Sequence, residues 1–369
     1  MWRRVLALVR KEFLALLKDP KSRLVLVVPP LVQLLVFGYA ATFDLRQVPI
    51  AVLDEDRSAA SRELLAAFGT GTPFVKVADL ASAAEIAPLV DRRRVLAVIR
   101  VGPRFADDLL SGRPAPVQVV VDGRNSNTAM IALGYVRSTV ERFNAGWMAA
   151  RGLPAPPARL EMRAWFNPNL ESRWFFIPGI VGMLTLVVTM LVTALTVARE
   201  REQGTFDQLL VTPLRPGEIL LGKALPGFVI GTLQATLIMV VARAWFGVPF
   251  LGSLAAFYAG LALFLLSAVG AGLLISSLSA TQQQGLLGAF LFMVPAVILS
   301  GFATPIANMP EAVQLVTYAD PLRYFLIVLR RVFLEGAGFA LVADQLWPMA
   351  VIGAVTMSLA SWLFRHRMY

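Results

Sequence analysis

Long stretches without charged residues constrain this chain more than any other feature of its sequence. A helix needs about 20 mostly apolar residues to cross the hydrocarbon core of a membrane. Backbone polar groups must be satisfied internally in lipid, so each such stretch is expected to be an α-helix. Six stretches reach or approach this length: Leu24–Phe43, Trp174–Ala198, Ala224–Ala242, Leu254–Leu278, Gly285–Ala303 and Trp347–Phe364. The sequence therefore predicts an α-helical membrane protein with six transmembrane helices.

The composition agrees with a membrane protein and excludes several chemistries. Hydrophobic residues make up 57% of the 369 residues and charged residues only 16%. The net charge of +10 is expected to report topology and contact with anionic lipid, and we predict no nucleic-acid partner. With no Cys and a single His, His366, a Cys/His metal site is excluded, and no acidic cluster suggests a carboxylate site. We predict no metal and no catalytic residue.

Basic residues in the short flanking segments predict the orientation, because cytoplasmic loops are enriched in Lys and Arg. Residues 1–23 carry seven of them and residues 199–223 carry four, whereas the turn after the third stretch carries only Arg243. Both termini and residues 199–223 are therefore predicted in the cytoplasm, and residues 44–173 outside. We expect the bacterial inner membrane. A cleaved signal peptide would have a shorter basic segment and a shorter apolar run.

Two segments before the second stretch are predicted to be distinct parts. Residues 1–23 include "WRRVLALVRKEFLALLKD", which has the apolar spacing of a basic amphipathic helix. Such a helix lies in the membrane interface or packs on a partner. Residues 44–173 alternate strand-like runs such as "PIAVLD" with helix-like runs. This alternation predicts an α/β extracytoplasmic domain inserted between transmembrane helices 1 and 2, with residues 159–165 as a candidate fifth strand.

The stretch "GEILLGKA", residues 217–224, matches seven of the eight positions of a phosphate-binding P-loop. A P-loop also needs small interior residues and a Ser or Thr after the Lys. This chain has bulky "EILL" inside the motif and Ala224 after Lys223. We conclude that the match is accidental and that the chain does not bind ATP by itself.

The same cytoplasmic loop carries a more specific pattern. Its sequence "EREQGTFDQLLVTPLRPGEILLGK" resembles the loop between the second and third spans in permease subunits of type 2 ABC exporters. The stretch "SGFATPIANMPEAVQLVTYADPLRYFLIVLRRVFLEG", residues 300–336, resembles the segment after span five in that family. The large insert places the resemblance in the multidrug-type branch. The likeness covers the whole chain, although the insert is its least diagnostic part.

The resemblance implies partners and a coupling element. It implies a dimer of ABC ATPase subunits that binds ATP and Mg²⁺, so this chain holds no cofactor and is not itself an enzyme. It also implies a second permease subunit, either identical or related, and a periplasmic adaptor is a further candidate. Residues 199–217 are predicted to be a cytoplasmic coupling helix that contacts the ATPase. Its candidate residues are Arg199, Glu200, Glu202, Gly204, Thr205, Thr212 and Pro213.

Candidate path residues come from the spans. Thr185, Thr189 and Thr193 share one helix face, which either contacts substrate or another protomer, or bonds each hydroxyl to a carbonyl four residues earlier. Pro295 frees a backbone carbonyl inside the fifth span. Residues 304–335 are predicted to be short helices at the outer face.

Spans without charge argue against an ion-coupled carrier and favour export of hydrophobic or amphipathic, drug-like compounds. The alternatives are export of a lipid, lipid-linked or peptide substrate, or a membrane-anchored receptor with an outside ligand domain.

Overall fold

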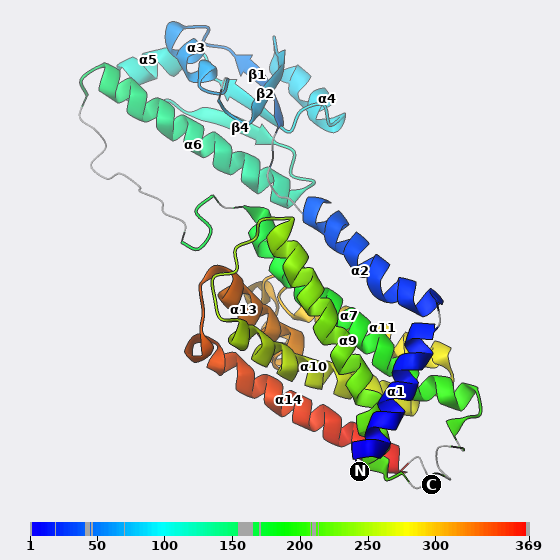
Figure 1. Cartoon of the computed structure of the whole chain (residues 1–369). Coiled ribbons are helices and arrows are strands. Elements are labelled where there is room, and N and C mark those ends of the chain that lie inside the picture. Colours follow the sequence, from blue (N-terminus) through cyan, green and yellow to red (C-terminus); the bar gives the residue numbers. More distant parts are fainter. Residues whose placement is uncertain are drawn as a thin grey trace. The chain divides into compact units, whose positions relative to one another are not determined.

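The computed structural model describes residues 2–18, 20–40, 45, 47–69, 71–153, 165–169, 171–206, 208, 212 and 214–366 (Figure 1). The chain separates into two compact units. Unit 1 comprises Met1–Thr42 and Ala164–Tyr369, and unit 2 comprises Phe43–Arg163.

Unit 2 is an α/β unit built on one small sheet. The strands β1 (Val48–Asp54), β2 (Phe74–Asp79), β3 (Ala97–Val101) and β4 (Val117–Val121) lie in the order β2-β1-β3-β4. β1 pairs in parallel with β2 and β3, whereas β4 is antiparallel to β3. The candidate fifth strand falls mostly outside the described residues. The helices are α3 (Ala59–Ala66), α4 (Ile86–Asp91), α5 (Phe105–Leu110) and α6 (Ser126–Ala150), with a short turn η1 (Ala83–Glu85) before α4.

Alternation along the strands gives unit 2 an apolar core on each face of the sheet. Ile50 and Val52 of β1 pack with Val136 and Phe143 of α6, together with residues of α3 and α5. Leu53, one position on, packs toward the opposite face with residues around α4. This two-residue period is expected of a sheet covered on both sides.

The turn after β4 is a self-contained structural feature. Arg124 Nη2 lies 2.7 Å from Asp122 Oδ2 and also donates to the carbonyl oxygen of Val90 at 2.5 Å. Hydrogen bonds from Arg124 lower the pKa of Asp122 to about 2. The side chains of this turn are therefore engaged in holding the loop against the end of α4.

Unit 1 consists of helices, and five of them are long and apolar enough to cross a membrane. These are α7 (Ser172–Glu202), α9 (Pro216–Ala244), α10 (Leu254–Leu278), α11 (Gln282–Leu299) and α14 (Phe339–His366). The last begins at Phe339, well before the predicted Trp347, so it is a longer helix than the sequence indicated. The two N-terminal helices are α1 (Trp2–Lys18) and α2 (Pro20–Ala40). α2 contains a shorter apolar run, Val28–Tyr39, and its role as the first span stays a prediction.

A bent pair of helices is the sixth candidate span. After η2 (Ile306–Asn308), the segment from α12 (Glu311–Val316) through η3 (Thr317–Ala319) meets α13 (Pro321–Leu334) at 82°. Pro321 begins α13 at its first position, where its missing N–H costs nothing. α13 packs against α7, α10 and α14 and buries Phe325 and Phe333 completely. Residues 304–335 thus contain short helices as predicted, the apolar face of α13 is directed into the bundle, and their place at an outer face stays a prediction.

Glycines allow the long helices of unit 1 to approach closely. A Cβ at Gly231 of α9 would lie 2.5 Å from Thr189 Oγ1, and a Cβ at Gly272 of α10 would overlap Thr193 Oγ1. Small residues at such positions let helix backbones pack tightly. The van der Waals contacts of such close packing help to hold helices together in lipid. α7 is therefore held directly between α9 and α10.

Candidate functional site

The C-terminal end of α7, which is predicted to lie in the cytoplasm, is followed by a glycine in the left-handed backbone conformation. Gly204 has φ +66°, and its N–H donates to the carbonyl oxygen of Arg201 at 3.1 Å. The N–H of Thr205 donates to the carbonyl oxygen of Glu200 at 2.9 Å. These two bonds form a Schellman motif, in which a left-handed residue satisfies the last carbonyls of a helix. The "GT" of the sequence motif thus ends α7 and sets the direction of the loop that follows.

Three consecutive charged residues before this glycine reach three different neighbours. Glu200 is 6% exposed and faces α1 and α9. Arg201 Nη1 donates to the carbonyl oxygens of Ser277 and Ser279 at the end of α10. Glu202 Oε2 accepts from the backbone N–H of Gln282 at 2.7 Å, at the start of α11. Each contact has favourable polarity, because a helix end exposes carbonyl oxygens and a helix start exposes N–H groups. Movement of the end of α7 must therefore displace four helices.

A cluster of four charged side chains lies beside this helix end, and three of them are buried. Lys223 of α9 is completely buried, and its Nζ lies 2.6 Å from Glu200 Oε2 and 3.3 Å from Glu12 Oε1. Lys11 Nζ lies 2.6 Å from the other Glu200 oxygen. The contact of Lys223 with Glu200 is an ion pair without hydrogen-bond alignment. Two cations face two carboxylates, so the cluster is neutral as a whole, as a buried site requires.

The stretch that resembles a P-loop forms the first turns of α9. Pro216 is at its first position, and Glu218 Oε2 accepts from the backbone N–H of Arg215 at 2.8 Å. Gly222 packs against the side chain of Leu8 in α1, where a Cβ would overlap it. The Gly and Lys of the motif thus bring α1 close and bind its carboxylate. A helical backbone cannot wrap around a phosphate, which is the physical reason that the P-loop match is accidental.

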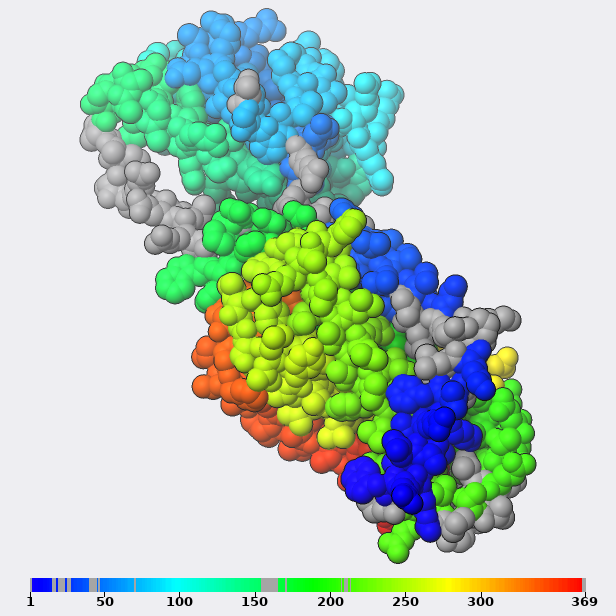
Figure 2. All heavy atoms as spheres, viewed as in Figure 1, coloured from blue at the N-terminus to red at the C-terminus, as the bar shows by residue number. Residues whose placement is uncertain are grey.

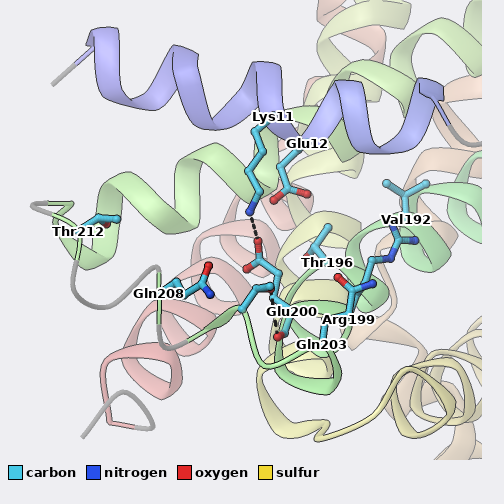
Figure 3. Close-up of a pocket in the computed structure, with 10 residues that line it drawn as sticks. Lys11, Glu12, Val192, Thr196, Arg199, Glu200, Gln203, Gln208 and Thr212 are labelled. Carbon is cyan, nitrogen blue, oxygen red and sulfur yellow. Dashed lines mark hydrogen bonds and ion pairs between the residues drawn. The ribbon is translucent and has the colours of Figure 1, made fainter.

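A polar cavity of about 420 Å³ opens between α1, the end of α7 and the loop after it (Figure 3). Lys11 and Glu12 point toward Glu200 from α1, and Arg199 lines the cavity from α7 (Figure 3). Arg199 is half-buried, and its side chain makes no hydrogen bond or ion pair with any residue that the structure describes. Figure 2 shows α1 on the outside of unit 1.

The structure brings most predicted coupling residues to this cavity. Arg199, Glu200, Thr205 and Thr212 line it, whereas Glu202 and Gly204 lie at the adjoining helix end. Pro213 lies outside the described residues. One difference concerns the predicted coupling helix at 199–217, because Arg199–Glu202 form the last turn of the long helix α7.

The threonine stripe is buried inside the chain. Thr185, Thr189 and Thr193 are each 0% exposed. Thr185 Oγ1 donates to the carbonyl oxygen of Val181 at 2.6 Å, and Thr193 Oγ1 donates to that of Thr189 at 2.7 Å. Thr185 and Thr193 thus follow the bonding alternative left open by the sequence, whereas the buried Thr189 Oγ1 has no hydrogen-bond partner among the described residues. A role in lining a path stays a prediction for all three. Pro295 lies in α11 at the wall of a separate small cavity.

Several residues of this site were missed from the sequence. The sequence places Lys11 and Glu12 in an interface helix and Lys223 in the cytoplasmic loop, and it predicts no site role for any of the three. Phe206 is buried 6.0 Å from the ring of Phe364 and anchors the loop to α14. One feature of the sequence does point to this site. Glu12 lies beside the apolar face of α1, and a carboxylate buried there needs a cationic partner.

Comparisons with known proteins identify the family. A model of the family described as "ABC-2 family transporter protein" matches residues 22–362. The chain belongs to the ABC-2 family of transporter permeases. It is 41% identical over 368 residues to the "Probable multidrug ABC transporter permease YbhR" of Escherichia coli (strain K12), covering 100% of both chains. It is 36% identical over 341 residues to "Probable multidrug ABC transporter permease YbhS" of the same organism, covering 91% of this chain and 89% of that one.

A third ABC-2 relative is more distant. "Inner membrane transport permease YhhJ" of Escherichia coli (strain K12) is 29% identical over 358 residues, covering 96% of this chain and 95% of that one. The family resemblance seen in the sequence is thereby confirmed. The chain is an ABC transporter permease with several apolar helices, a membrane component of a transport system.

Proposed function

We propose that this permease exports hydrophobic or amphipathic, drug-like compounds across the bacterial inner membrane, powered by a separate dimer of ABC ATPase subunits. In this proposal the termini and the 199–223 loop face the cytoplasm and unit 2 lies outside. A second permease subunit completes the path. The names of the relatives support multidrug export, and the membership in the ABC-2 family supports the ATPase partner.

The observation that carries the proposal is the fan of contacts from Glu200, Arg201 and Glu202. A force applied at the end of α7 reaches α1 and α9 through Glu200, α10 through Arg201, and α11 through Glu202. Allosteric coupling needs a physically connected element with two arrangements, and the packed helices joined by these short polar contacts supply the connection. The half-buried Arg199 beside them is available for a carboxylate of the ATPase.

The test uses a candidate ABC ATPase with a complete Walker A motif, which is to be sought first among the genes next to this one. Arg199→Glu reverses a charge without breaking any contact within the described residues. We expect its co-purification with the ATPase to fall about tenfold or more, because unlike charges across an interface become like charges. Arg243→Glu is the matched control, since Arg243 is exposed at the opposite end of α9. Equal co-purification of both variants with the wild-type chain would contradict the assignment of this surface.

Orientation is tested separately. A cysteine introduced at Gln203, which is exposed beside the cavity, should react with a membrane-impermeant maleimide only after the cells are opened. Labelling of intact spheroplasts at Gln203 would place the site outside and remove the proposed ATPase contact.

A further inference from the structure

A small cavity on the surface of α11 differs from the polar cavity described above. It measures about 200 Å³ and lies between α11 and the α12–η3 segment. Leu291, Pro295 and Leu299 line it from α11, and Val316 and Ala319 line it from the other side. The one charged residue in its wall is Asp320. An apolar cavity with a single ionisable group in its wall is a common form of small-molecule site.

Only half of the Asp320 carboxyl group is used by the fold. Oδ1 accepts from the backbone N–H of Leu322 at 2.9 Å and caps α13. Oδ2 has almost no accessible surface and accepts no hydrogen bond within the described part of the chain. The residue as a whole is 7% exposed. Its neighbour Arg323 is engaged elsewhere, because it donates to Thr317 Oγ1 and stacks on the ring of Tyr318 at 4.1 Å.

This arrangement leaves an acceptor without a donor. A buried polar atom that lacks its partner costs about 1–3 kcal/mol, and more when it is charged. The fold has no need of the second oxygen, because one oxygen suffices to cap a helix. A ligand that brings a charged N–H group to Oδ2 would remove this cost, and an apolar body on the same ligand would fit the remaining wall. An alcohol donates a weaker hydrogen bond, and a carboxylate would be repelled.

We propose that the cavity between α11 and α12 binds hydrophobic ammonium compounds through Asp320. On binding, a rotation of the Asp320 side chain brings Oδ2 to the cavity, where it accepts from the N–H⁺ group, and the apolar part contacts Leu291, Pro295 and Val316. This inference rests on the proposed function, because it specifies the charge of a compound that the permease accepts. Binding itself requires neither the ATPase nor ATP, so the two proposals can fail separately.

The chain offers a well-matched variant. Asp320→Asn keeps an oxygen that accepts from the Leu322 N–H, and Asn is as good a helix cap as Asp. It removes the negative charge and places either an amide donor or a neutral oxygen toward the ligand. The fold of α13 is thereby kept, which thermal unfolding of the variant checks directly. Leu233→Asn, on the exposed face of α9, controls for an added amide on the membrane surface.

The experiment labels the full-length chain in lipid nanodiscs with phenylbutylamine carrying a diazirine on its ring. Mass spectrometry should locate the label within residues 287–299 or 316–320. Unlabelled phenylbutylamine should compete about tenfold or more better than phenylbutanol, because a charge-assisted bond is about twice as strong as a neutral one. Asp320→Asn should lose this preference, whereas Leu233→Asn should keep it.

Three results would overturn the inference. Labelling of Asp320→Asn that equals wild type would show that the carboxylate has no part in binding. Equal competition by phenylbutanol would show that only the apolar wall matters. Crosslinking of Leu291→Cys chains to one another, with no label in these residues, would show that a second copy covers the cavity. Failure of the proposed function has a different signature, namely labelling that persists in a chain that binds no ATPase.

Discussion

Replacing Lys223 by methionine removes one of the two cations from the cluster of four charged side chains. Lys223 is completely buried, and the side chains of Glu12 and Glu200 are 11% and 8% exposed. Removing one partner of a buried ion pair costs about 3–5 kcal/mol, because the remaining charge stays in a medium of low polarity. Glu200 keeps Lys11, but Lys11 is 51% exposed and its pair contributes about 1 kcal/mol or less. We therefore expect a loss of about 3 kcal/mol for Lys223→Met, at the lower end of that range.

A second substitution separates electrostatics from packing. Lys223→Met with Glu12→Gln restores neutrality, because Lys11 and Glu200 remain as a balanced pair. We expect the double variant to recover about 2 kcal/mol, which is within the range of coupling energies between residues in contact. Equilibrium unfolding of the purified chain in mixed micelles, followed by circular dichroism, measures both values. Lys76→Met is the control, since Lys76 is an exposed residue whose pair with Asp79 should contribute less than about 1 kcal/mol.

Two results would contradict the expected role of the buried ion pair. If Lys223→Met were as stable as wild type, the burial of this lysine would have no energetic consequence. If the double variant were no more stable than the single one, the loss would come from packing at position 223 and not from an unpaired carboxylate.

Three further predictions follow from contacts described above. Gly272→Ala should destabilise the chain by about 1–3 kcal/mol, because its Cβ would overlap Thr193 Oγ1. Adding Thr193→Ala should recover only part of the loss in the same micelle assay, because the Cβ of residue 193 would still lie 2.8 Å from the added Cβ. Gly204→Ala should cost about 1–2 kcal/mol of backbone strain, and Gly204→Asn clearly less, because Asn tolerates the left-handed region; equal losses would contradict the Schellman assignment. Arg124→Gln should return the pKa of Asp122 from about 2 toward its ordinary 3.8. Because the folded pKa is lowered, the stabilisation is present above about pH 4 and is lost as the pH falls toward 2. Amide exchange of residues 122–125 should therefore be faster in Arg124→Gln at pH 6, and the difference from wild type should become smaller as the pH falls toward 2.

The sequence was informative wherever the structure follows a local rule. Absence of charge over a membrane-length run located α7, α9, α10, α11 and α14, although it placed the start of α14 too late. Alternation located the strands of unit 2. The number of spans was harder to predict. The length of an apolar run does not reveal a bent pair such as α12 and α13, which meet at a break next to Pro321. Propensity also cannot show that α13 is buried among α7, α10 and α14.

The candidate site required information that no local pattern holds. Glu200 was identified as a coupling residue through a family motif, but its partners were not. Lys11 is 189 residues away from it in the sequence, and Glu12 is 211 residues away from Lys223. Such pairings are set by the packing of α1 on α9, which depends on Gly222 and Leu8. The same packing gives Gly222 and Lys223, two residues of the P-loop pattern, a role in contacts between helices.

The distance between Glu12 and Lys223 along the chain also has a consequence for biogenesis. The ribosome completes α1 long before it completes α9, so the carboxylate of Glu12 lacks its buried partner Lys223 while unit 2 is being synthesised. The contacts of Glu12 with Lys223 and of Leu8 with Gly222 can form only after α9 has been made. A nascent chain stopped before residue 223 would therefore lack the contact of Glu12 with Lys223.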